Sequence, residues 1–457
     1  MKKSLLVSLI ILVMLGLILA GCSSTTSPTG QSSSPPPSAS GPQQIVLGSV
    51  LPLTGNLAGF GEGGAFGVKA AVDDINKAGG VFVKEYNRKL TVKLVQVDDQ
   101  SDPIKSGTLA ESLVLQDKVN FFVGSPQSPP AFAAIATVAQ KYKTPYIDDA
   151  GPFEPYDAQR SQASPAWTYA WATGFHIGAP YAAGDFRANQ PGYTIVDVAS
   201  SLIKQFADQT NRKTAIFASD EPDGRGWYMS FPAGLTQMGL KVDGADKELG
   251  LAPPDTTDFS SIIKQWINNQ DEILFGNALA PWFGTLWKQA REMGFKPKLV
   301  YAGRAALYYT DINSWGGDLP NGVGCEQYWS PSYDPKSCPG IGDTTPQSLF
   351  NKWVAAKNQP LNEAMGRGYG NAQVLFDAIQ RAGTLNKDSV NEAIGKTDLA
   401  TIGGRVVYGQ SQFNGYALSW GQWFKTDKPY KWEWQTVVSS HSFIPTTAKP
   451  LFPIPYN

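Results

Sequence analysis

The sequence predicts an α/β fold made of two doubly wound, Rossmann-like lobes. Short apolar segments typical of buried strands alternate with helical segments, and this alternation predicts right-handed crossovers and parallel sheets. The pattern stops at an aromatic stretch, 167–175, and then begins again with segments of similar size. The chain of 457 residues is also longer than one ordinary hydrophobic core accommodates, which favours two lobes.

The first strand is predicted over Ile45–Leu51, an apolar run that ends at Pro52. A glycine-rich loop is predicted from Thr54 to Gly64. A helix is predicted over 65–77, because apolar residues recur there at helical spacing and Gly79-Gly80 follows. In such a unit the helix N-terminus lies over the carboxyl end of the strand, where small polar or anionic ligands bind.

The same alternation predicts the remaining elements of both lobes. In the first lobe we expect strands at 90–97, 120–123 and 145–147, helices at 103–116 and 131–141, and loops at 124–129 and 148–152. In the second we expect helices at 195–209, 259–268 and 281–293, strands at 214–218, 272–275 and 298–302, and loops at 219–226 and 303–305. Two further helices, 347–356 and 368–382, precede an aromatic, strand-rich end. The loops after the strands should face a cleft between the lobes, which is where ligands bind in such folds.

The N-terminus has the pattern of an export signal. Lys2 and Lys3 precede an apolar run, Ser4–Ala20, and the box Leu19–Cys22 resembles the cleavage site of bacterial lipoproteins. We therefore expect residues 1–21 to be a signal peptide, Cys22 to carry lipid, and the Ser/Pro-rich stretch 22–43 to be a flexible tether. The protein would be exported and held at the outer face of a membrane. An uncleaved membrane anchor is the alternative.

The charge balance and the cysteines limit the partners and metal sites that can be expected for this protein. The chain has 38 basic and 39 acidic residues, and a net charge of −1 gives no reason to expect nucleic acid as a partner. Two cysteines remain after Cys22, and in an exported protein Cys325 and Cys338 are predicted to form a disulfide, worth about 3 kcal/mol. A two-thiol metal site is the alternative, but His176 and His441 are not at ligand spacing, so no metal is expected.

The motifs of catalysis are incomplete. The stretch Gly59–Gly64 fits G-x-G-x-x-G, but residues 52–58 separate it from the strand, so a dinucleotide cofactor is not expected. A serine triad needs a histidine base, and no G-x-S-x-G elbow occurs. Adjacent carboxylates such as Asp98-Asp99 and Asp148-Asp149 are interpreted as caps or strand ends. The sequence therefore predicts neither an enzyme nor a cofactor.

Several segments together resemble a known family. They read G-S-V-L-P-L-T-G-N-L-A-G-F-G (48–61), A-V-D-D-I-N-K-A-G-G-V (71–81), V-D-D-Q-S-D-P (97–103), T-P-Y-I (144–147) and Q-A-R-E-M-G-F (289–295). From Ile45 to about Phe424, the chain resembles the type I periplasmic binding proteins of branched-chain amino acid ABC transporters. The resemblance implies a Venus flytrap, in which two lobes close on one small molecule, and a monomer is expected.

The resemblance also implies a domain organisation and partners. Three chain crossings are expected, near 170–174, 328–333 and 402–407. The N-terminal lobe would comprise 44–172 plus 331–404, and the C-terminal lobe 173–330 plus 405–457. The receptor would deliver its ligand to a membrane permease powered by a cytoplasmic ATPase. The alternative is an extracellular sensor of the same fold that acts in signalling instead of uptake.

In the first lobe, the family's site lies in the loops after the third and fourth strands. Ser128 matches a serine that binds the ligand carboxylate, although it could instead cap the helix at Ala131. Phe60 falls where the family packs a ring on the ligand. The other matching positions are Gln127, Ala150, Gly151 and Pro152, and Pro152 replaces a usual hydroxyl.

In the second lobe, this chain departs from the family pattern. Asp223 stands where a tyrosine is common, and Arg304 stands where an acidic residue usually pairs with the ligand's amino group. An arginine fork suits a carboxylate, so an organic or aromatic carboxylate is preferred as the ligand, with amino acids or amides left open. Alternatively, Arg304 pairs with Asp223 and leaves the site neutral. Four aromatic side chains lie near these loops and are candidates either for ligand contact or for the core. They are Trp227, Trp282, Phe283 and Tyr308.

Overall fold

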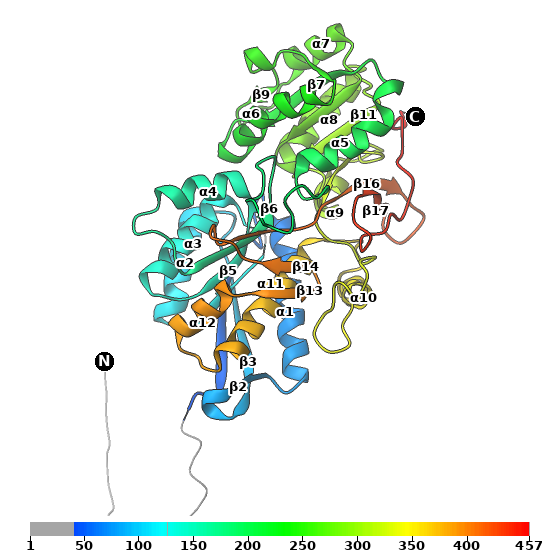
Figure 1. The fold of residues 1–457 in the computed structure, drawn as a ribbon. Helices are drawn as coiled ribbons and strands as arrows, with labels where there is room; N and C mark the ends of the chain where they lie inside the picture. The colour runs from blue at the N-terminus through cyan, green and yellow to red at the C-terminus, as the bar shows by residue number, and fades with distance from the viewer. Residues whose placement is uncertain (1–40, 126, 457) are drawn as a thin grey trace, which may run out of the picture. The chain divides into compact units, whose positions relative to one another are not determined.

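Two mainly parallel sheets organise the computed structural model, which describes residues 41–125 and 127–456 (Figure 1). The predicted signal peptide at 1–21, the predicted lipidation site Cys22 and most of the tether 22–43 lie outside these residues. The chain from Pro42 onward forms one compact unit. None of the helices described within it is long and apolar enough to cross a membrane.

The first sheet has the strand order β15-β6-β5-β4-β1-β3-β2, and β2 is its antiparallel member. Its strands are β1 (Gln44–Leu51), β2 (Val81–Val83), β3 (Arg88–Asp98), β4 (Phe121–Val123), β5 (Tyr146–Pro152), β6 (Ala170–Phe175) and β15 (Phe413–Gly415). Alternate residues of β1 enter different cores: Leu47 joins the cluster that contains Val68 of one helix, whereas Val50 joins the cluster that contains Leu113 of another. Helices therefore cover both faces, as expected for a doubly wound lobe.

The helices on the first sheet form two sets. One set is α1 (Ala58–Lys77) and α11 (Ala364–Ala382), and the other is α2 (Pro103–Leu115), α3 (Pro129–Lys141) and α4 (Phe153–Gln162). Figure 1 shows α1 and α11 side by side. Additional elements are α10 (Pro346–Lys357), α12 (Lys387–Gly395) and a hairpin of β13 (Asp398–Thr401) and β14 (Gly404–Val407).

The second sheet has the order β17-β16-β12-β11-β10-β7-β8, with β9 also paired to β7. Its strands are β7 (Lys213–Ser219), β8 (Lys241–Val242), β9 (Leu251–Ala252), β10 (Ile273–Asn277), β11 (Leu299–Gly303), β12 (Gly324–Gln327), β16 (Ser419–Lys425) and β17 (Trp432–Ser439). Its helices are α5 (Ile195–Phe206), α6 (Pro222–Gln237), α7 (Ser260–Asn269), α8 (Ala280–Glu292) and α9 (Tyr309–Ser314). The strands β7, β10 and β11 pair in parallel, and β16 pairs antiparallel with both of its neighbours. The fold class predicted from the sequence is confirmed.

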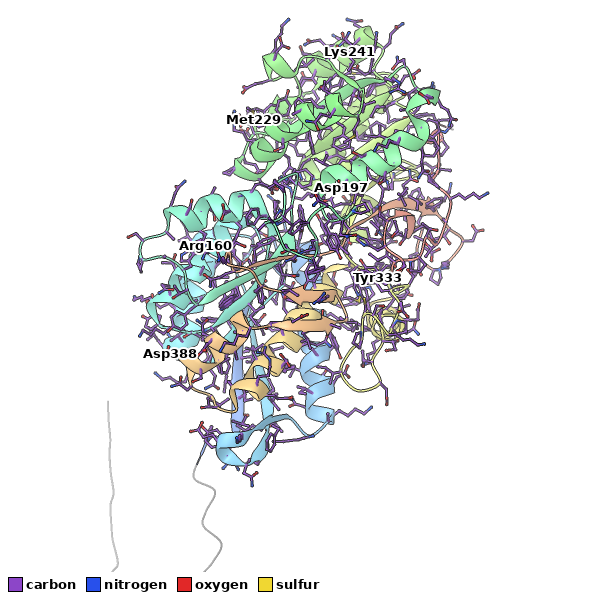
Figure 2. All side chains as sticks on the ribbon, viewed as in Figure 1. Arg160, Asp197, Met229, Lys241, Tyr333 and Asp388 are labelled. Atoms are coloured by element: carbon purple, nitrogen blue, oxygen red, sulfur yellow. The ribbon has the colours of Figure 1, made fainter. Side chains whose placement is uncertain are left out.

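The chain passes between the two sheets after β6, after β12 and after β15. Tyr333, labelled in Figure 2, is buried in the second of these crossings. The predicted third crossing and two of the predicted lobe boundaries differ from the strand pairing. The predicted boundary at 172/173 would divide β6, and the predicted C-terminal segment 405–457 includes β15, which pairs with β6 in the first sheet. The segment 402–407 forms part of the β13–β14 hairpin because its residues pair locally.

The glycine-rich stretch predicted as a loop from Thr54 to Gly64 is mostly helical, because α1 begins at Ala58. Its glycines lie where α1 approaches other backbone closely. A Cβ added to Gly61 would lie 2.2 Å from the Pro52 carbonyl oxygen. Further along α1, in the part predicted as helix, one added to Gly67 would lie 2.0 Å from the Met365 carbonyl oxygen of α11. Close packing thus outweighs the poor helix propensity of glycine, which is about 1 kcal/mol per residue.

The predicted disulfide is wrong, because Cys325 and Cys338 are both buried free cysteines. Cys325 lies within β12, paired with Gly421, whereas Cys338 lies in a turn where its N–H donates to the Asp334 carbonyl oxygen at 2.8 Å. A disulfide requires close Cα atoms and aligned Cβ bonds, and the strand and the turn do not bring the two thiols together. Within residues 41–125 and 127–456, no cluster of His, Cys, Asp or Glu could hold a metal ion.

We predict that Gly67→Ala lowers the free energy of unfolding by about 1–3 kcal/mol, because the new methyl group would push α1 away from Met365. Alanine is otherwise the better helix former. The matched control is Gly226→Ala in α6, an exposed position where an added Cβ meets no described atom within 4 Å. The free energy of unfolding of this control should rise by up to about 1 kcal/mol. Urea denaturation measures both, and equal stabilisation of the two variants would contradict the packing explanation.

Candidate functional site

A cavity with about 550 Å³ of empty volume lies at the carboxyl ends of strands from both sheets. This is the edge at which doubly wound folds bind ligands. The residues that line it are Leu57, Phe60, Gln127, Ser128, Pro129, Asp149, Gly151, Pro152, Phe175, Asp223, Trp227, Asn277, Arg304, Leu307, Glu326, Tyr328 and Arg367.

Most of the predicted site residues meet at this cavity, and two do not. The predicted residues that line it are Phe60, Gln127, Ser128, Gly151, Pro152, Asp223 and Arg304. Ala150 points instead into the core under α3 and α4, because β5 continues through the segment predicted as a loop and its side chains alternate. Trp282 of α8 is buried against Phe217 and Phe259, and its indole N–H donates to the Pro253 carbonyl oxygen at 3.0 Å.

On the first-lobe wall, Gln127 and Ser128 are held by their neighbours. Gln127 is 6% exposed, and its Nε2 donates to the Val50 carbonyl oxygen at 2.9 Å and to Asp99 Oδ2 at 3.1 Å. Its Oε1 has no hydrogen-bond partner in the described part of the chain. Ser128 Oγ accepts the Ala131 N–H at 3.3 Å and caps α3, which is the structural role that the sequence left open.

A buried ion pair joins Arg367 of α11 to Asp149 of β5 on the same wall. Asp149 is fully buried and also accepts the Gly151 N–H at 2.8 Å. The Arg367 guanidinium lies 4.4 Å from the Tyr328 ring centre. Burial raises the pKa of Asp149 to about 6, although the charge of Arg367 opposes that shift. Sequence reasoning missed this pair, because Arg367 lies in a helix more than two hundred residues from Asp149.

A second buried cluster forms around Arg304 on the second-lobe wall. Arg304 follows β11 with a left-handed backbone, φ 61°, and its Nη1 lies 2.7 Å from Asp223 Oδ2. Its Nη2 bonds to Glu221 and to Ser219 Oγ. Glu221 in turn caps α6 by accepting the N–H groups of Asp223 and Gly224, each at 3.0 Å. The structure therefore shows the alternative in which Arg304 pairs with Asp223, and it adds Glu221 as a second acid.

The pKa directions in this cluster follow from burial and from the arginine. Burial raises the pKa of Asp223 to about 6, against the attraction of Arg304, and Glu221 raises it further. For Glu221, burial acts to raise the pKa, but the charge and hydrogen bond of Arg304 hold it below its usual value. The ionised forms of both carboxyls are therefore stabilised by the same guanidinium, that of Arg304.

Two polar residues at the carboxyl ends of second-sheet strands were also missed. Asn277, the last residue of β10, is 1% exposed, and neither of its amide atoms has a hydrogen-bond partner among the described residues. Glu326 of β12 accepts hydrogen bonds from the hydroxyls of Tyr301 and Tyr328, and burial raises its pKa. A polar residue that ends an apolar strand, as Asn277 does after Ile273–Gly276, is the signal that could have found it.

Aromatic rings form the apolar part of the cavity. Phe60 lies in the first turn of α1, and its ring packs edge-on against Tyr308 at 4.6 Å. Phe175 lies 4.9 Å from the Tyr328 ring and 5.9 Å from the Trp227 ring. Of the other ring candidates, Trp227 lines the cavity and Tyr308 is buried behind Phe60.

We predict that Arg304→Gln lowers the free energy of unfolding by about 3–5 kcal/mol, because Glu221 and Asp223 would stay buried without their counter-charge. Arg225→Gln is the matched control: Arg225 also meets two acids, Asp220 and Glu248, but its side chain is 46% exposed against 14% for Arg304. The control should change stability by at most about 1 kcal/mol. Chemical denaturation at neutral pH measures both variants, and equal losses would refute the importance of burial.

Most of the chain matches known periplasmic binding proteins in sequence. The periplasmic binding protein family matches residues 44–415. The Leu/Ile/Val-binding protein BraC3 of Rhizobium johnstonii is 25% identical over 370 residues, which cover 80% of this chain and 88% of that protein. The Leu/Ile/Val-binding protein homolog 3 of Brucella melitensis is 24% identical over 343 residues, which cover 75% of this chain and 80% of that protein.

Solved structures show the same fold. The leucine binding protein LivK of Thermotoga maritima has a TM-score of 0.64 at 17% identity, and covers 86% of this chain and 99% of its own. A second structure is a solute binding protein of an ABC transporter from Rhodopseudomonas palustris in complex with 3,4-dihydroxy benzoic acid. Its TM-score is 0.63 at 17% identity, and the match covers 87% of this chain and 99% of its own. The chain therefore belongs to the periplasmic binding protein family, as a type I member related to the binding proteins of branched-chain amino acid transporters.

Proposed function

We propose that this protein is a lipid-anchored, extracytoplasmic receptor that captures one small molecule between its lobes and delivers it to an ABC permease driven by a cytoplasmic ATPase. Family membership supports solute binding for an ABC transporter. The lipid anchor rests on the sequence around Cys22, and delivery to a permease rests on what such binding proteins do. The proposed role is binding without catalysis, in line with relatives that are named as binding proteins.

The observation that carries the proposal is that one cavity is lined by both lobes. Phe60 and Gln127 come from the first lobe, and Asn277 and Arg304 come from the second. A ligand in this position contacts both walls at once and stabilises the arrangement in which they face each other. Because the lobes are connected by three crossings, ligand binding would select a closed state by a hinge motion.

The cavity wall indicates the body of the ligand. Phe60, Phe175 and Trp227 supply ring faces, and Leu57 and Leu307 add aliphatic surface. We therefore propose a small ligand with an apolar or aromatic body, as the preference for an organic or aromatic carboxylate also requires. The charge of its head is a separate question, because Arg304 is already paired with two acids.

We predict that native mass spectrometry of the purified protein detects one small molecule per chain, and that Phe60→Ala weakens its binding about tenfold or more by removing a ring from the cavity wall. Phe82→Ala is the matched control, since Phe82 is 42% exposed and does not line the cavity. The control should bind as the wild type does. Equal binding by both variants would contradict this cavity as the site, and a protein that neither copurifies with nor binds any small molecule would contradict the proposed function.

A further inference from the structure

Each cationic group that could hold a ligand carboxylate in this cavity already faces at least one buried acid. Arg304 and Arg367 are the cationic side chains among the described residues that line it. Arg304 faces Glu221 and Asp223, and Arg367 faces Asp149. Nε of Arg304 and Nε and Nη2 of Arg367 have no hydrogen-bond partner among the described residues. A carboxylate on either guanidinium would nevertheless compete with a buried acid that has no other counter-charge.

Two of the helix N-termini at the cavity, those of α3 and α6, are occupied as well. Helix α3 begins with Pro129 and Pro130, which have no N–H, and the next N–H, that of Ala131, is bonded to Ser128 Oγ. At α6 the first residue is Pro222, and Glu221 takes the N–H groups of the two residues after it. Neither terminus keeps the free N–H groups with which a helix N-terminus binds an anion.

The remaining electrostatics also disfavour an anion. Asp149, Asp223 and Glu326 line the cavity against the two arginines, and Glu221 lies directly behind Arg304. Even without Glu326, the ionised forms of Asp149, Asp223 and Glu221 outnumber the two arginines. A ligand carboxylate in this buried space would be repelled, because like charges interact strongly where water is excluded.

Two buried amides have unused hydrogen-bonding atoms facing this space. Asn277 has both Oδ1 and Nδ2 without a partner, and Gln127 has Oε1 without one, within the described residues. The two side chains come from opposite lobes, and both line the cavity. Buried amides are normally hydrogen-bonded, so a ligand is the natural partner. Asn277 needs a donor and an acceptor side by side, and Gln127 needs a donor; a carboxylate supplies acceptors only.

We infer that the cavity takes an uncharged ligand whose head is an amide-type group, such as a carboxamide, urea or lactam, paired with Asn277 and Gln127 and attached to an apolar or aromatic body. This inference rests on the proposed function, because it names the chemical class that the receptor would bind. An amide-type head differs from the carboxylate head that the sequence predicted on the basis of Arg304.

The test compares three heads on the same tail. The compounds are 4-methylpentanamide, 4-methylpentanoate and leucine, and, with an aromatic tail, 3-phenylpropanamide, 3-phenylpropanoate and phenylalanine. Isothermal titration calorimetry at pH 7.5 with the full exported chain, freed of any copurified molecule, measures each affinity. We expect each amide to bind about tenfold or more tighter than its matched carboxylate and amino acid.

Two variants test the assigned residues. Asn277→Leu keeps the shape but removes both amide atoms, and should weaken amide binding about tenfold or more. Asp223→Asn leaves Nη1 of Arg304 free of its acid while Glu221 still pairs with Nη2, so carboxylate affinity should rise about tenfold or more. Asp271→Asn is the control for the latter: Asp271 is also a buried acid of the second lobe, but it does not line the cavity. It should leave the ranking of the heads unchanged.

The outcomes separate this inference from the proposed function. A carboxylate or an amino acid that binds tighter than its matched amide overturns the amide class and leaves the receptor function standing. Unchanged amide binding in a folded Asn277→Leu, or no gain of carboxylate binding in Asp223→Asn, overturns the roles assigned here. If no compound of any head binds and no small molecule copurifies, the proposed function fails and this inference fails with it.

Discussion

Two buried ion pairs, one in each lobe, constrain the rest of the site. Arg367 holds Asp149 on the first-lobe wall, and Arg304 holds Asp223 together with Glu221 on the second. In each lobe an arginine beside the cavity is thus opposed by at least one buried acid. The cavity thus has charged walls, and each cation among its described lining residues faces a buried acid. Among the described residues, the uncharged side-chain atoms left without a partner on these walls belong to the amides of Asn277 and Gln127.

The fold explains how these pairs come to face each other. Parallel strands bring their carboxyl ends to one edge, so the residues that end β5, β10 and β11 gather at one place. Glycines in α1 allow it to lie directly on α11, which carries Arg367. The second crossing begins at Tyr328, whose ring lies against Arg367 and whose hydroxyl bonds to Glu326. A ligand that touches both walls is therefore coupled to a segment that connects the lobes.

The sequence predicted the fold class because strands, helices and the loops after strands leave local signals. It predicted most of the cavity through the resemblance to a family: Phe60, Ser128 and Arg304 stand at positions that the family uses for its ligand, and they line the cavity. Long-range partners were not predictable: Arg367 meets Asp149 only after α11 packs on the sheet, and Glu221 meets Arg304 across 83 positions. The glycine-rich stretch was misread as a loop because residues far along the chain explain its glycines: Gly63 packs against Asn362 and Gly64 against Ser125.

The central claim is that a small molecule bridges the two lobes while both ion pairs stay intact. A crystal structure of the protein with its copurified molecule tests this most directly. The account predicts one molecule in the cavity whose head bonds to Asn277 and Gln127, with Arg304 still on Asp223 and Arg367 still on Asp149. A ligand carboxylate seated on Arg304 with Asp223 turned away, or a ligand bound outside this cavity, would contradict it.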